Sequence, residues 1–201
     1  MTPNTLREKC RQICPTDYGV NIAAPTVRPT PWQLVPLWGV IGDGCECGRV
    51  GCKSAGKHPR RNAWQHHTVD NRAAFDAFRR RHPAANWGVL LSPSGIVDVE
   101  FDAAEGADTA RELLAGIVTP SYESARSVHR LFRAPDGWSP SVAVTNWRGL
   151  EIRTGTATRA AQSVIPPSVH HSGRRYRYLS GLGPRVPLAV LPAAILAATN
   201  R

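Results

Sequence analysis

The sequence lacks the features of several large protein classes. It contains no run of about 18 apolar residues, and its first residues, MTPNTLREKCRQIC, lack the apolar stretch of a secretory signal. We therefore expect a soluble, cytoplasmic protein without a membrane-spanning helix. The Walker A, Gly-x-Gly-x-x-Gly and Gly-x-Ser-x-Gly motifs are also missing, which argues against a P-loop NTPase, a dinucleotide-binding fold and an α/β-hydrolase.

Acidic residues are scarce relative to basic ones. The 201 residues include 25 Lys and Arg against 15 Asp and Glu, which gives a formal net charge of +10 at pH 7. Such a surplus attracts polyanions, because binding releases their counter-ions, and nucleic acid is the natural candidate. A GC-rich genome would produce an arginine-rich chain without any selection for binding, so charge alone leaves both explanations open.

Cysteine is rare, and the odd count of five does not suit a disulfide framework. Three cysteines lie within residues 45–60, CECGRVGCKSAGKHPR, and zinc prefers thiolate and imidazole ligands of the kind found there. The predicted zinc ligands are Cys45, Cys47, Cys52 and His58. His66 or His67 could replace His58, and a chance cluster of free thiols is the alternative to a closed structural site. We interpret Cys10 and Cys14 as ordinary thiols.

Strand and helix patterns intermix without the strict alternation of a doubly wound sheet. Strand-like segments lie at 33–41, 87–92, 96–102, 127–132, 149–155 and 162–168. Helical patterns lie at 6–13, 69–83, 107–117 and in the apolar tail 187–199, and Asp70 is expected to cap the second of these. The turn signal Pro-Ser-Gly is expected to join the strands 87–92 and 96–102. These patterns predict an α+β domain with a mostly antiparallel sheet.

Three carboxylates share one face of the predicted strand 96–102. Side chains alternate along a strand, so Asp98, Glu100 and Asp102 point to one side and the apolar residues between them point to the other. Two unit charges about 4 Å apart repel by roughly 4 kcal/mol at an effective dielectric of about 20, so such a stripe needs a counter-ion. Mg²⁺ or Mn²⁺ would provide one, since both choose oxygen ligands and can hold a triphosphate. A solvated polar face is the alternative.

Two later segments carry polar residues that could join this site. Ser127 and His129 share a strand face, where the histidine could contact a phosphate, act in acid–base chemistry or be structural. Glu151 and Arg153 share a face of the segment 149–155. On a neighbouring strand, Glu151 could complete a metal cluster.

Taken in order, these segments resemble the N-terminal domain of bifunctional DNA primase/polymerases, in the archaeo-eukaryotic primase superfamily. The resemblance runs from about residue 34 to residue 179 and comprises VPL, the CxC, Cys and GKHP run, NWGVLL with SGIVDVEFD, SVHRLF, and GLEIRTG followed by QSVIPPSVHHSGRRYRYL. The family's motifs are a carboxylate pair on a strand, a Ser-x-His and a later acid. They fall on Glu100 with Asp102, on Ser127 with His129, and on Glu151. The sequence departs from the family pattern in its Glu-x-Asp, where Asp-x-Asp is usual.

The resemblance implies a primase-polymerase fold, with an RRM-like, mostly antiparallel catalytic sheet, an N-terminal α/β unit and a small zinc knuckle. The catalytic domain is expected over 32–186, with the knuckle at 45–58. The proline-punctuated start predicts an N-terminal arm over 1–31, and the apolar tail predicts a C-terminal helix or linker over 187–201.

The resemblance also implies an enzyme, a DNA-directed nucleotidyltransferase that uses NTPs or dNTPs on a single-stranded DNA template, with a replicative helicase as a further partner. Two Mg²⁺ or Mn²⁺ ions would be held by Glu100, Asp102 and Glu151, with Asp98 as a further candidate. The implied nucleotide-binding residues are Ser127, His129 and Arg153, of which His129 is also catalytic. Two alternatives remain open: a non-catalytic nucleic-acid-binding module with the same fold, and a zinc-stabilised interaction protein.

Overall fold

The computed structural model describes residues 32–199 except 103 and 104, so the helix expected at 6–13 and the thiols Cys10 and Cys14 lie outside the described residues. The described strands are β1 (Leu34–Leu37), β2 (Val40–Ile41), β3 (Gly44–Cys45), β4 (Asn86–Leu90), β5 (Ile96–Asp102), β6 (Ser121–Glu123), β7 (Ser127–Arg133), β8 (Val144–Trp147), β9 (Leu150–Arg153), β10 (Gln162–Val164), β11 (Arg177–Tyr178) and β12 (Ala189–Val190). The helices are η1 (Trp64–His66), α2 (Arg72–Arg81), η2 (Ser92–Ser94), α3 (Ala107–Leu114) and α4 (Ala193–Ala198). Among these, no helix is long and apolar enough to cross a membrane.

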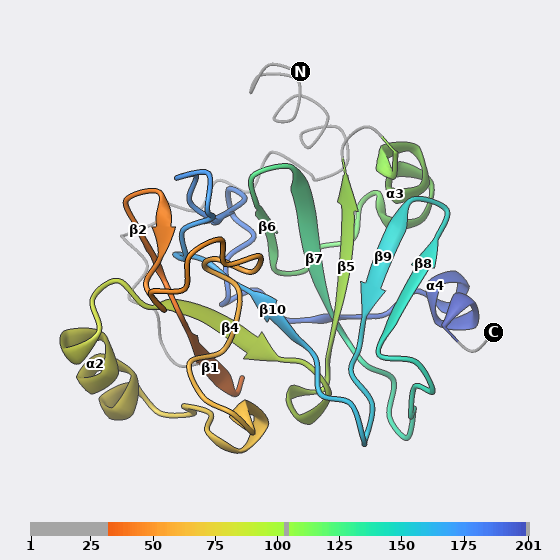
Figure 1. The fold of residues 1–201 in the computed structure, drawn as a ribbon. Coiled ribbons are helices and arrows are strands. Elements are labelled where there is room, and N and C mark those ends of the chain that lie inside the picture. The colour runs from red at the N-terminus through yellow and green to blue at the C-terminus, as the bar shows by residue number, and fades with distance from the viewer. Residues whose placement is uncertain (1–31, 103–104, 200–201) are drawn as a thin grey trace.

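The described strands form three sheets in which almost all neighbours are antiparallel (Figure 1). The largest sheet has the order β11-β6-β7-β5-β9-β8, and β12 runs parallel to β7 beside it. A smaller sheet has the order β1-β4-β10, and β2 pairs with β3. The predicted α+β class with mostly antiparallel sheets is therefore confirmed, while the RRM-like topology and the domain boundaries stay predictions.

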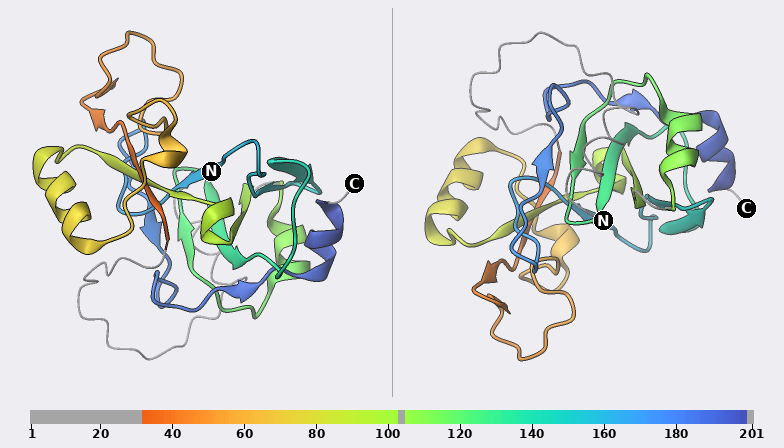
Figure 2. Two further views of the ribbon diagram at one scale, coloured as in Figure 1. Left: turned by 90° about the horizontal axis from the view of Figure 1, so that it is seen from below. Right: turned by 90° about the horizontal axis from the view of Figure 1, so that it is seen from above.

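One face of the large sheet packs against α3 and α4, which lie side by side at one end of the molecule (Figure 2). The alternate residues Val97, Val99 and Phe101 of β5 are buried there with Leu114 and Ile195 from the two helices. Because this face takes the apolar side chains of β5, the alternation of the strand sends its carboxylates to the opposite face.

A buried cation ties the large sheet to the end of α3. Arg130 on β7 is inaccessible to solvent and donates hydrogen bonds to the carbonyl oxygens of Leu114, at 2.6 Å, and of Ile117. The last carbonyls of a helix have no partner within the helix and carry the negative end of its dipole, so a guanidinium stabilises them. Arg130 therefore belongs to the fold and not to a nucleic-acid surface.

The small sheet forms a second core with α2. Phe75 and Phe78 of α2 pack on Trp87 of β4, with ring centroids 4.4 and 5.4 Å from that of Trp87. The two phenylalanines are three residues apart and so share one helix face, as the sequence predicts. α2 begins at its N-cap Asn71, whose side-chain oxygen accepts a hydrogen bond from the backbone N–H of Ala74 at 2.9 Å. The prediction that Asp70 caps this helix is wrong by one residue.

The strands β4 and β5 follow one another closely in the sequence but do not pair. They are joined through η2, at the expected turn, yet β4 belongs to the small sheet and β5 to the large one. The physical reason is that β4 already has β1 on one edge and β10 on the other, so it has no free hydrogen-bonding edge for β5.

Candidate active site and metal knuckle

The polar face of the large sheet brings the predicted strand residues together. They lie on β7, β5 and β9, which are neighbours in the sheet. The facing pairs are Glu100 with His129, Glu100 with Glu151, Asp102 with Ser127, and Asp98 with Arg153. Side chains directly opposite on antiparallel strands have Cβ atoms about 5 Å apart, so these residues form one continuous polar surface.

Asp98 and His129 form the buried end of this surface. Asp98 is inaccessible to solvent, and its Oδ2 lies 3.0 Å from Nδ1 of His129. Tyr122 stacks on the imidazole with a centroid separation of 4.6 Å and an interplanar angle of 8°. Burial lowers the pKa of His129, but the Asp98 carboxylate outweighs this effect and raises the pKa above its ordinary value. The contact therefore fixes the ring in one orientation and favours its protonated form.

Asp98→Asn is expected to lower the pKa of His129. The substitution removes the carboxylate that raises the pKa and keeps the burial that lowers it, so the value should fall below that of the wild type. An NMR titration of the His129 side chain in both proteins measures the change, with Asp136→Asn on an exposed loop as the control. An unchanged His129 pKa in the Asp98 variant would show that the contact does not set it.

Arg153 lies between two of the acids. Its Nη2 is 3.2 Å from Oε2 of Glu100 and 2.5 Å from Oε1 of Glu151. Burial lowers the pKa of Arg153, and Glu100 and Asp98 raise it above its ordinary value, so the guanidinium keeps its charge. The acidic stripe thus has cationic neighbours within the protein, Arg153 at its middle and His129 at its buried end.

Two cavities open on this face and share Glu100 and Ser127. The smaller, of about 90 Å³, lies over His129 and is rimmed by the cationic groups of Lys57, Arg126 and Arg153. The larger, of about 450 Å³, is bordered by Asp102 and Glu151 and extends over β8 and the turn to β9. The face therefore offers carboxylate oxygens on one side and positive charge on the other.

Several residues of the smaller cavity were missed in the sequence because their spacing carries no signal. Arg126 precedes β7, and His170 and Tyr176 come from the loop between β10 and β11. Burial, Lys57 and the neighbouring His171 lower the pKa of His170 to about 4, so it is neutral at pH 7. His170 and Tyr176 are brought to His129 by long-range packing, which no motif in the sequence encodes.

The cysteine segment forms a compact knuckle. The potential ligand atoms of Cys45, Cys47, Cys52 and His58 all lie within 4.8 Å of one another. Nε2 of His58 is 3.3 Å from Sγ of Cys45 and 3.5 Å from Sγ of Cys52, so His58 fills the place for which His66 and His67 were alternatives. Three thiols and one imidazole at this separation could hold a tetrahedral zinc ion. Within the described residues, this is the one set of three or more such side chains that converges.

The knuckle is fastened to the small sheet at Gly56. Its φ of +75° is strained for any residue with a side chain, and a Cβ here would come within 3.0 Å of Val40 and of the carbonyl of Val169. The Asn86 side chain donates to the Gly56 carbonyl at 2.8 Å, and Gln162 donates to the Lys57 carbonyl at 3.0 Å. The knuckle therefore holds Lys57 beside the cationic cavity.

The fold and the site together define a mixed α+β domain in which a sheet face of acids and a histidine lies beside a potential metal knuckle. The family model for the N-terminal domain of bifunctional DNA primase/polymerases (Prim-Pol) matches residues 26–194, and the chain belongs to this family. Membership indicates DNA and nucleotide substrates. No curated protein matches the sequence significantly.

Proposed function

We propose that the protein catalyses template-directed nucleotidyl transfer on single-stranded DNA, as a primase/polymerase. The observation that carries the proposal is the shared polar face of β5, β7 and β9. There Glu100, Asp102 and Glu151 lie beside His129 and two adjoining cavities, of which the smaller has a cationic rim. Nucleotidyl transfer requires oxygen ligands that hold divalent cations, and it requires positive groups nearby that bind the phosphates. The antiparallel order of the large sheet supports the RRM-like catalytic sheet of the primase-polymerase fold.

The acids fit the divalent ions that this family generally uses. Glu100, Asp102 and Glu151 offer only carboxylate oxygens, are partly accessible and border the larger cavity. Mg²⁺ or Mn²⁺ bound by them would lower the pKa of a 3′-hydroxyl and stabilise the pyrophosphate leaving group. Arg153 balances the charge of Glu100 and Glu151, and Asp98, which contacts His129, acts as a positioning residue.

The smaller cavity is proposed to take the triphosphate of the incoming NTP or dNTP. His129 faces it, Ser127 borders it, and Arg153 and Lys57 add positive charge. His129 keeps its position because Asp98 and Tyr122 contact it on the buried side. The knuckle, loaded with structural zinc, would keep Lys57 in place at the rim.

His129→Ala is expected to raise the KM for the incoming nucleotide while leaving the affinity for single-stranded DNA nearly unchanged. The imidazole faces the small cavity and not the outer surface, so its loss should affect the triphosphate first. Steady-state extension kinetics and fluorescence anisotropy with labelled DNA measure the two quantities, and Asp136→Ala, an exposed residue on a loop away from both cavities, is the control. Parallel losses of DNA affinity and melting temperature would identify His129 as a core residue instead.

A non-catalytic DNA-binding module is the second candidate. It is favoured by Arg153, whose guanidinium contacts Glu100 and Glu151 in the place where a metal ion would need their oxygens. DNA binding without metal-dependent extension would identify this function.

A further inference from the structure

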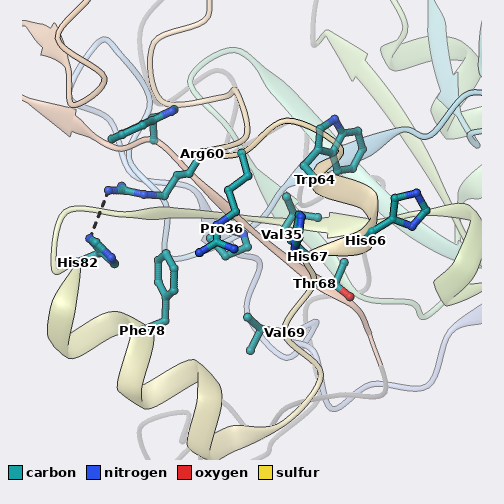
Figure 3. A pocket seen from close by; sticks show the side chains of 12 residues that line it. Val35, Pro36, Arg60, Trp64, His66, His67, Thr68, Val69, Phe78 and His82 are labelled. Atoms are coloured by element: carbon teal, nitrogen blue, oxygen red, sulfur yellow. Dashed lines mark hydrogen bonds between the residues drawn. The ribbon is translucent and has the colours of Figure 1, made fainter.

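A separate pocket lies on the other side of the knuckle segment, between β1, η1 and α2. Its volume is about 540 Å³, within the range of about 300–1,000 Å³ that holds small organic ligands. It is lined by Val35, Pro36, Trp38, Arg60, Arg61, Trp64, His66, His67, Thr68, Val69, Phe78 and His82. Figure 3 shows Phe78 of α2 and His82, the C-cap of that helix, on one side and Trp64 and His66 of η1 on the other, with Val35 and Pro36 between them.

The chemistry of this lining is aromatic and cationic. Its large apolar rings are those of Trp38, Trp64 and Phe78, which are all partly accessible. No lining residue is acidic. Arg60 is already engaged: its Cζ lies 4.0 Å above the Trp38 ring, and its Nη1 is 2.5 Å from Oε2 of Glu46. Arg61 is exposed and adds a positive charge at the pocket. Flat apolar surfaces beside positive charge fit a planar base that carries a phosphate.

One short segment links this pocket to the proposed catalytic face. Lys57 borders the cavity over His129, His58 is a potential zinc ligand, and Arg60 and Arg61 line the aromatic pocket. The backbone of this segment is held by β1, since the N–H of Trp38 donates to the His58 carbonyl at 3.0 Å and the N–H of Arg60 donates to the Pro36 carbonyl at 3.2 Å. The two cavities are therefore lined by residues that lie only three positions apart in the sequence, Lys57 at one and Arg60 at the other.

We propose that this aromatic pocket binds one nucleotide of single-stranded DNA, outside the catalytic face. The base stacks on Trp64 or Phe78, and Arg61 and the exposed His66 and His67 contact its phosphate. The identification of this strand as the template rests on the proposed function, whereas the binding of the nucleotide does not. The site is a second contact that holds the strand while the catalytic face works.

The test compares Trp64→Ala, Arg61→Ala and Arg80→Ala with the wild type. Arg80 is the matched control, because Phe78 and His82 share the pocket side of α2 and Arg80, midway between them, points away. Fluorescence anisotropy with a short labelled oligothymidylate is measured without divalent ions or nucleotides, so the result does not depend on catalysis. Melting temperatures show whether each variant is folded.

Trp64→Ala is expected to weaken binding at least roughly fivefold, the lower end of the contribution of one stacked base. Arg61→Ala should weaken it as well and reduce the slope of log affinity against log salt concentration by about 0.7, the value for one lost contact to a single-strand phosphate. Arg80→Ala should leave the affinity for the oligothymidylate and its dependence on salt concentration close to those of the wild type. Because Arg61 is exposed, its variant keeps the test valid if Trp64→Ala fails to fold.

Equal affinities for the wild type, Arg61→Ala and a folded Trp64→Ala would overturn the proposal. Binding of dTMP alone that is as tight as that of the oligothymidylate and is weakened by Trp64→Ala would show that the pocket takes a free nucleotide, and would overturn the assignment to a strand. A protein that loses DNA affinity in both pocket variants but shows no extension activity in any form would refute the proposed function and leave the pocket standing.

Discussion

Cys52→Ser is expected to abolish stoichiometric zinc binding and to lower the melting temperature strongly. The Cys52 thiol is one of four ligand atoms that converge within 4.8 Å, and a three-ligand remnant cannot close the tetrahedron. Structural zinc contributes roughly 10–16 kcal/mol of apparent binding free energy, which acts as folding free energy for the segment that it holds. The knuckle carries Lys57, and Arg61 follows its last ligand His58 by three residues, so the variant should also bind DNA less tightly.

Elemental analysis of the purified variant and thermal unfolding measure these two effects. Cys10→Ser is the control, because the sequence predicts an ordinary thiol at that position. One zinc per chain in Cys52→Ser, as in the wild type, would disprove the ligand assignment.

Glu100→Ala and Asp102→Ala are each expected to abolish nucleotidyl transfer, while Asp98→Ala only reduces it. The first two acids border the larger cavity and are partly accessible, whereas Asp98 is fully buried and its Oδ2 is 3.0 Å from Nδ1 of His129. Loss of a direct metal ligand should cost far more than loss of a residue that orients another, for which roughly 10- to 100-fold is typical. Asp136→Ala, an exposed acid on a loop, is the control.

Primer-extension rates of the four variants decide the register of the acid pair. An inactive Asp98→Ala together with a near wild-type Asp102→Ala would show that the pair is Asp98 with Glu100. Wild-type rates in all three site variants would show that the acidic stripe is a solvated face.

Features that depend on local pattern could be predicted from the sequence. Strand 96–102 has the predicted bounds as β5, because its strict alternation leaves one apolar and one acidic face. The knuckle ligands were predicted because four donors lie within a span of 14 residues, which a short loop can bring together. In both cases the functional side chains lie close to one another in the sequence.

Features that depend on long-range packing could not be predicted. The position of Arg153 between Glu100 and Glu151 requires the pairing of β5 with β9 in one register, and the burial of Asp98 against His129 requires the pairing of β5 with β7. The alternation along strand 96–102 predicts a metal counter-ion for the acidic stripe, but it carries no information about these cations. The aromatic pocket likewise depends on how α2 and η1 meet across β1, which no motif encodes.

The most direct test of the proposed function is a templated extension assay with purified protein, a labelled primer on single-stranded DNA, and NTPs or dNTPs. The reaction is run with Mg²⁺, with Mn²⁺ and with neither, for the wild type and for Asp102→Ala. We expect template-dependent extension by the wild type only when a divalent ion is present, and no extension by the variant. Absence of extension by the folded, zinc-loaded wild type under all of these conditions, or equal extension by Asp102→Ala, would contradict the proposed function.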